Sequence, residues 1–130
     1  MMLAADSSGV VTSHGLTSNM LGGRDWHHNG ATGAGQGGVE DGVGLNNIGL
    51  LVRVWGKVTQ RDTTGLTYFY IDDGSGILDG TQTASTDNVG VRVIADPTPY
   101  SPGDYVTITG ISSCFKDGSG NLQRKLLPVP

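Results

Sequence analysis

The 130-residue chain carries a formal net charge of −4 and contains 22 glycines, while only 15% of its residues are charged. This length fits a single domain with one core. The composition excludes a mainly helical protein, because helices need periodic runs of Ala, Leu, Glu and Lys. The acidic balance argues against strong non-specific nucleic-acid binding, which needs a surplus of Lys and Arg on one face. We therefore expect an all-β domain.

Cysteine and apolar content narrow the class of protein further. Cys114 is the single cysteine, so it forms no internal disulfide, and no Cys/His grouping has the spacing of a zinc site. A run of about 18 apolar residues is absent, so we expect no membrane span. Met1 to Ala5 lack the basic and apolar regions of a signal peptide. The compartment stays open on this evidence, although an acidic chain rich in Gly, Ser and Thr favours an extracellular location.

Residues 1–47 are predicted to form a Gly-rich N-terminal arm, and residues 48–130 the folded domain. Residues 1–49 hold 12 of the 22 glycines and show no sustained period of 2 or 3.6. The string GAGQGG at 33–38 matches GxGxxG, but no predicted strand precedes it and no predicted helix follows, so we interpret it as arm and not as a dinucleotide site. Partial docking of the arm on the domain is predicted from its apolar residues, Leu16, Met20, Leu21 and Trp26.

The first predicted strand, residues 50–59, has a clear period of two. Val52, Val54 and Val58 alternate with polar or aromatic residues, which predicts a strand whose valines are buried. Gly56 lies on the valine side and predicts a bend or bulge. Four further strands are expected at residues 67–72, 90–95, 104–112 and 122–129.

The residues between the predicted strands indicate how the strands are connected. Residues 78–88 are expected to form a long polar loop between the second and third strands. Prolines at 97, 99 and 102 prevent a normal helix between the third and fourth strands. The sequence DGSGN at 117–121 predicts a hairpin turn into the last strand.

The strand motifs resemble a known family. The runs VRVWGKVT, YFYIDDGSG, VRVIA and GDYVTITGISS, within residues 48–129, resemble the bacterial OB-fold nucleic-acid-binding family. The stretch GVGLNNIGLLVRVWGKVT is also similar to modules attached to large secreted bacterial proteins. The resemblance implies a five-stranded Greek-key OB-fold barrel. This chain departs from the family pattern in its longer loop between the second and third strands and in its linking helix, which the prolines reduce or remove. OB barrels bind oligonucleotides, oligosaccharides or proteins, so the resemblance fixes no ligand.

A candidate ligand-binding face follows from the register of the first strand. With the valines inside, the alternate side chains project outward, and the second and third strands add outward aromatic and basic residues. This set of candidate site residues comprises Arg53, Trp55, Lys57, Tyr68, Tyr70 and Arg92. We expect this set to bind short single-stranded nucleic acid, with bases stacked on the aromatic rings and phosphates held by Arg and Lys. Two alternatives stay open: stacking on sugar rings, or packing against the arm or a neighbouring domain of a parent protein.

Other chemistry has little support in the sequence. Asp25, His27, His28 and Asn29 are interpreted as incidental surface, because adjacent His side chains point apart in an extended chain. The segment from Asp72 to Asp79 lacks the ligand spacing of an EF-hand and is interpreted as a turn. Cys114 is interpreted as a small buried apolar residue, and no catalytic signature accompanies the abundant serines. We expect a non-catalytic module without metal or cofactor.

Overall fold

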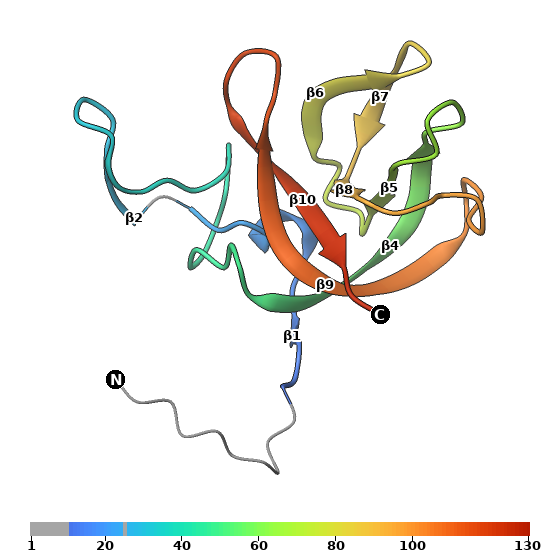
Figure 1. The fold of residues 1–130 in the computed structure, drawn as a ribbon, viewed down its shortest axis with the longest axis horizontal. Coiled ribbons are helices and arrows are strands. Elements are labelled where there is room, and N and C mark those ends of the chain that lie inside the picture. Colours follow the sequence, from blue (N-terminus) through green and yellow to red (C-terminus); the bar gives the residue numbers. More distant parts are fainter. Residues whose placement is uncertain (1–10, 25) are drawn as a thin grey trace.

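The computed structural model describes residues 11–24 and 26–130, and five of its strands close into a barrel (Figure 1). The barrel strands are β4 (Leu51–Arg61), β5 (Phe69–Asp72), β8 (Val91–Val93), β9 (Tyr105–Lys116) and β10 (Leu122–Pro128). The order around the barrel is β4-β5-β8-β10-β9, and β9 pairs back onto β4. Within the barrel, β8 and β10 run parallel, and the other neighbouring pairs are antiparallel. This confirms the predicted all-β, five-stranded Greek-key OB-fold barrel.

Strand β4 is long enough to pair with two different neighbours. Its first part pairs with β9, from Leu51 opposite Ile111 to Lys57 opposite Tyr105. Its last part pairs with β5, from Lys57 opposite Asp72 to Arg61 opposite Phe69. Outward side chains at the two ends of β4 therefore lie over different parts of the barrel wall.

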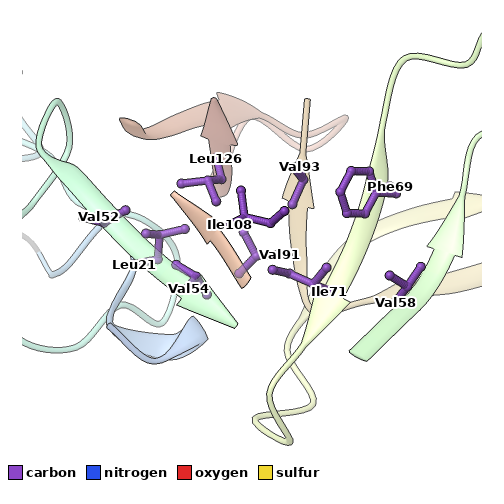
Figure 2. Close-up of a cluster of buried hydrophobic side chains, with 10 residues drawn as sticks. All are labelled: Leu21, Val52, Val54, Val58, Phe69, Ile71, Val91, Val93, Ile108 and Leu126. Atoms are coloured by element: carbon purple, nitrogen blue, oxygen red, sulfur yellow. The ribbon is translucent and has the colours of Figure 1, made fainter. Parts of the chain in front are cut away.

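The barrel interior is filled by the alternate residues of its strands, as the period of two predicts (Figure 2). Val52, Val54 and Val58 of β4 are at most 1% exposed, so the predicted register of this strand is confirmed. The other members of the core cluster are Leu21, Phe69, Ile71, Val91, Val93, Ile108 and Leu126.

Gly56 has a different role from the one predicted. The pairing of β4 with β9 is continuous through Gly56, and the register shift lies between Val58 and Gln60, against β5. A Cβ at Gly56 would lie 2.9 Å from the backbone of Asp72. The missing side chain therefore allows the end of β5 to approach β4 closely. The bulge predicted at Gly56 is wrong, because the register shift lies between Val58 and Gln60.

The predicted polar loop at 78–88 is instead a hairpin of two strands, β6 (Leu78–Thr83) and β7 (Thr86–Val89), which pair with each other in a separate sheet. Ala84 and Ser85 form its turn with φ values of 50° and 64°. Two consecutive positive φ values are typical of a type I′ hairpin turn, which usually carries Asn-Gly. The turn lacks that signal, so the sequence did not reveal the hairpin. The predicted loss of the linking helix is confirmed, since residues 94–104, all described, contain none.

The described part of the arm forms short elements beside the barrel. β1 (His14–Gly15) pairs in parallel with β4, a 3-10 helix covers Ser18–Met20, and β2 (Trp26–Asn29) pairs with β3 (Ala34–Gln36). Leu21 is fully buried in the core and Leu16 packs against it, whereas Met20 is 38% exposed. The side chain of Trp26, like Met1 to Ala5, lies outside the described residues.

Polar contacts fix the arm to the barrel. Asp73 accepts a 2.7 Å hydrogen bond from the Ser18 backbone N–H. Arg124 of β10 is 3% exposed and donates from Nη2 to the backbone oxygens of Asn19 and Asp41, both at 3.2 Å. Burial lowers the pKa of Arg124, and the charge of Asp41 opposes this effect. Within the described residues, no helix has the length and apolar character needed to cross a membrane.

Candidate functional site

Three of the candidate residues project from β4 as predicted. Arg53, Trp55 and Lys57 are exposed, and 52% of the Trp55 surface is accessible. Within residues 11–24, Leu16, Thr17 and Met20 of the arm line a hollow together with Trp55, and the described part of the arm leaves half of the indole accessible. A half-exposed tryptophan flanked by two cations is available to a ligand from solvent.

The partners of these residues come from β9. Trp55 lies opposite Thr107 and Lys57 lies opposite Tyr105, whose side chain is 72% exposed. A hollow of about 690 Å³ opens here; we call it the Trp55 groove and define it by Trp55, Lys57, Asp72, Asp73 and Tyr105 among its lining residues. Sequence reasoning missed Tyr105, although its alternation with the partly buried Val106 indicates an outward side chain.

Two carboxylates stand at one wall of the Trp55 groove and also shape the turn after β5. Asp72 accepts hydrogen bonds from the backbone N–H groups of Gly74 and Gly76, which confirms the predicted turn. Burial acts to raise the pKa of Asp73, but hydrogen bonds from Ser75 and Ser18 outweigh it and hold this pKa below its usual value. Asp73 is therefore a fixed acceptor for hydrogen-bond donors at neutral pH.

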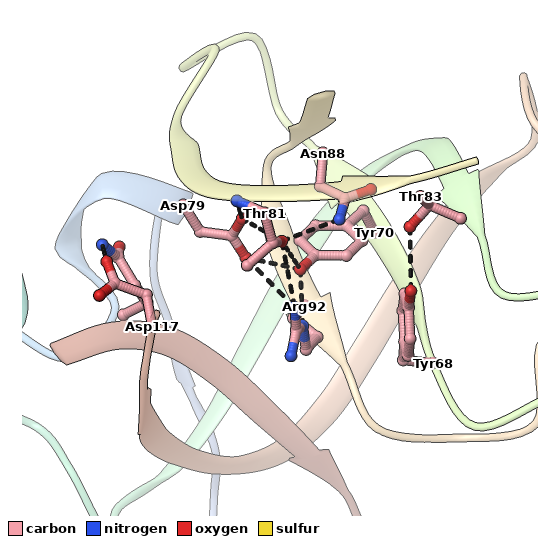
Figure 3. A network of polar contacts seen from close by, with 9 residues as sticks. Tyr68, Tyr70, Asp79, Thr81, Thr83, Asn88, Arg92 and Asp117 are labelled. Carbon is pink, nitrogen blue, oxygen red and sulfur yellow. Dashed lines mark hydrogen bonds and ion pairs between the residues drawn. The ribbon is translucent and has the colours of Figure 1, made fainter. Parts of the chain in front are cut away.

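The other three candidate residues lie in a second region, under the β6–β7 hairpin (Figure 3). Tyr70 points outward from β5 as predicted, but it is 0% exposed, because residues of the hairpin cover it. Its hydroxyl donates to Asp79 at 2.5 Å and lies 3.1 Å from the hydroxyl of Thr81. Burial, followed by the hydrogen bond to Asp79, raises the pKa of the Tyr70 phenol. A ligand cannot stack on this ring while the hairpin stays in place.

Arg92 lies at the centre of this second region. Its Nε donates to the Tyr70 hydroxyl at 2.6 Å, and its Nη2 donates to Thr81 at 3.1 Å and lies 3.8 Å from an Asp79 oxygen. Its guanidinium carbon is 4.1 Å from the centroid of Phe115, a distance typical of cation–π contact. Tyr68 is partly buried, and its ring centroid lies 5.0 Å from the guanidinium carbon of Arg92. The hydroxyl groups of Tyr68 and Thr83 are hydrogen-bonded at 3.0 Å. We call this region the Arg92 cluster; it comprises Tyr68, Tyr70, Asp79, Thr81, Arg92 and Phe115.

The candidate residues thus do not share one face: Trp55 and Lys57 line the Trp55 groove, with Arg53 beside them on β4, and the other three belong to the Arg92 cluster. The Trp55 groove lies where β4 pairs with β9, whereas Tyr70 and Arg92 are paired across β5 and β8. Tyr68, Tyr70 and Arg92 are absent from the lining of the groove. The expectation of a single binding surface is therefore corrected, because β4 changes neighbours at Lys57.

Metal binding has no assembled site among the described residues. No group of three His, Cys, Asp or Glu side chains comes together in the described part of the chain. Asp25 and the side chain of His27, two of the four residues weighed as metal ligands, lie outside it. Cys114, which was predicted to be buried, is only partly buried, and it is a free thiol.

The chain was compared with known proteins. No protein-family model and no curated protein matches it. Function is therefore inferred from the geometry of the two regions.

Proposed function

We propose that this chain is a non-catalytic binding module and that its ligand is a neutral saccharide held against Trp55. The observation that carries this proposal is the exposed indole, 52% accessible, beside the exposed ring of Tyr105 in one groove. Flat aromatic surfaces pack well against the apolar face of a sugar ring, and they lose little side-chain entropy on binding.

The polar lining of the Trp55 groove suits sugar hydroxyl groups. Lys57 supplies a hydrogen-bond donor, and the carboxylates of Asp72 and Asp73 supply acceptors. Binding sites of this kind combine apolar surface with a few placed polar groups that orient the ligand. The groove therefore offers both kinds of contact that a saccharide requires.

Local charge favours a neutral ligand over a polyanion. Lys57 lines the Trp55 groove together with two carboxylates, Asp72 and Asp73, whereas Arg53 lies outside this lining. The whole chain is acidic, with a net charge of −4. Phosphate binding gains its affinity from uncompensated cations, so the Trp55 groove has little of the charge that nucleic acid needs.

A second candidate ligand is short single-stranded nucleic acid. The observation that favours it is the placement of Arg53 and Lys57 on either side of an exposed tryptophan, since bases stack on aromatic rings while cations meet phosphates. The aromatic residues expected to extend this site, Tyr68 and Tyr70, are engaged in the Arg92 cluster. This candidate rests on β4 alone.

A titration at two salt concentrations separates the two ligands. Neutral soluble glycans and labelled oligonucleotides are each added to the whole chain. We expect glycan binding that hardly changes with salt, whereas nucleic-acid affinity would fall steeply. Oligonucleotide binding with that steep salt dependence, and none to glycans, would replace the first proposal by the second.

The residue-level test uses Trp55→Ala with Leu78→Ala as a matched control. Leu78 is 58% exposed and lies on the β6–β7 hairpin, outside the groove lining. Loss of one stacking contact is worth about 1–3 kcal/mol, so Trp55→Ala should weaken binding about tenfold or more, and Leu78→Ala should leave it unchanged. Equal affinity of both variants and the unaltered chain would overturn the role of Trp55, and the absence of any glycan binding would overturn the proposed function.

A further inference from the structure

The Trp55 indole forms part of two hollows. The second hollow, of about 570 Å³, is lined by Trp55 and Arg53 from the barrel and by residues of the arm. On β4, Arg53 lies two positions before Trp55 and lines the second hollow. Lys57 lies two positions after Trp55 and lines the first hollow. The two hollows therefore lie toward opposite ends of the strand, with the indole shared between them. We call the second one the arm hollow.

The arm hollow is built by the part of the arm that is fixed to the barrel. The Leu16 backbone N–H donates to the Arg53 backbone oxygen at 3.0 Å, and His14 pairs with Val52. Leu21, which directly follows Met20, is buried in the core and so fixes the other end of this segment. The wall formed by Leu16, Thr17 and Met20 is thus anchored at both of its ends.

The two hollows differ in chemistry. The Trp55 groove carries carboxylates, whereas the arm hollow combines the apolar side chains of Leu16 and Met20 with the guanidinium of Arg53 and the hydroxyl of Thr17. An acetamido group matches this lining, since its methyl group packs on apolar side chains and its carbonyl oxygen accepts from a donor. Toward the described residues, the Arg53 side chain makes one long hydrogen bond, 3.4 Å from Nε to the Thr109 hydroxyl, so its other guanidinium N–H groups can donate to a ligand.

On the basis of the proposed function, we infer that the ligand is a linear oligosaccharide of N-acetylated sugars. It crosses Trp55, with one sugar unit in the Trp55 groove and another in the arm hollow. A single sugar fills one hollow only. Affinity therefore rises with chain length until both hollows are occupied, because the second unit binds at a high effective concentration once the first is held.

The experiment measures the affinity of N-acetylglucosamine and its linear oligomers of two to six units, with unsubstituted glucose oligomers as the comparison series. For the unaltered chain we expect at least a tenfold gain from the monosaccharide to the longer acetylated oligomers, followed by a plateau. The glucose series should gain less. Affinity that is independent of length, or equal for the two series, would overturn the inference while leaving saccharide binding at Trp55 intact.

Two matched variants assign the gain to the arm hollow. Met20 is 38% exposed, so Met20→Ala should fold, and it should remove most of the gain with length in the acetylated series. Tyr105→Ala, in the Trp55 groove, should weaken binding at every length. Thr17→Ala provides a second arm variant if Met20→Ala disturbs folding by circular dichroism. A length dependence that survives both arm substitutions would contradict the inference.

Discussion

The Trp55 groove and the Arg92 cluster contain the same kinds of residue and differ in what covers them. Each has outward aromatic rings beside basic side chains on the barrel wall. Trp55 and Tyr105 are 52% and 72% exposed, whereas Tyr70 is 0% exposed. Alternation along a strand therefore decides which side chains point away from the barrel interior, and the segment packed over them decides whether they reach solvent.

The segment that makes the difference is the β6–β7 hairpin. Its residues Asp79 and Thr81 satisfy both the Tyr70 hydroxyl and the Arg92 guanidinium. Along the first part of β4, where β9 pairs on one edge and β1 on the other, the described part of the arm lies at the edge of the indole and leaves half of it exposed. We therefore expect substitutions in the Arg92 cluster to change stability, and substitutions in the Trp55 groove to change binding.

Tyr70→Ala should produce the largest loss of stability. Truncating a fully buried aromatic side chain costs about 3–5 kcal/mol, and it leaves the carboxylate of Asp79, a residue 3% exposed, without the phenolic donor. Tyr70→Phe, which keeps the ring, should cost about 1–3 kcal/mol. Urea unfolding followed by circular dichroism measures both. A loss below about 1 kcal/mol for Tyr70→Ala would show that the hairpin does not form a packed cover.

Asp73→Asn should have a smaller effect, because it removes the charge that accepts the Ser18 backbone N–H. We expect a loss of about 0.5–1.5 kcal/mol in the free energy of unfolding at neutral pH. Folding lowers the pKa of Asp73, so its contribution is complete above its unfolded-state pKa of about 3.9 and is lost as the pH falls through the folded-state value.

Unfolding measured between pH 7 and pH 2 checks this sign. The difference between Asp73→Asn and the unaltered chain should shrink as the pH falls below about 4. Asp87→Asn, on the exposed part of the hairpin, serves as the control with little expected change. A difference that grows on acidification would contradict the assignment.

Tyr105→Ala should change stability least, by about 0.5 kcal/mol or less, because the side chain is 72% exposed. Trp55→Ala should cost about 1 kcal/mol or less. Thermal unfolding of both variants, compared with Tyr70→Ala, ranks the two regions directly. Should Tyr105→Ala prove as destabilising as Tyr70→Phe, the Trp55 groove would be a structural feature and its proposed binding role would lose support.

The sequence was informative wherever the period of two was long and local. The alternation of Val52, Val54 and Val58 predicted the buried and exposed faces of β4, and prolines at 97–102 predicted the missing helix. It failed at the hairpin, because Ala84 and Ser85 carry no turn signal although both adopt positive φ. Tyr105 was overlooked for a different reason: its importance depends on lying opposite Lys57, a pairing made between distant segments.

The class of fold, the five barrel strands and the side-chain directions from Val52 to Val58 could be predicted from the sequence, because these depend on spacing along one strand. Which outward residues share a surface follows from the tertiary fold. That outcome depends on β4 changing partners at Lys57 and on a hairpin folding over Tyr70 and Arg92. Contacts between segments far apart in the chain leave no periodic pattern, so the division between the Trp55 groove and the Arg92 cluster emerges only from the folded molecule.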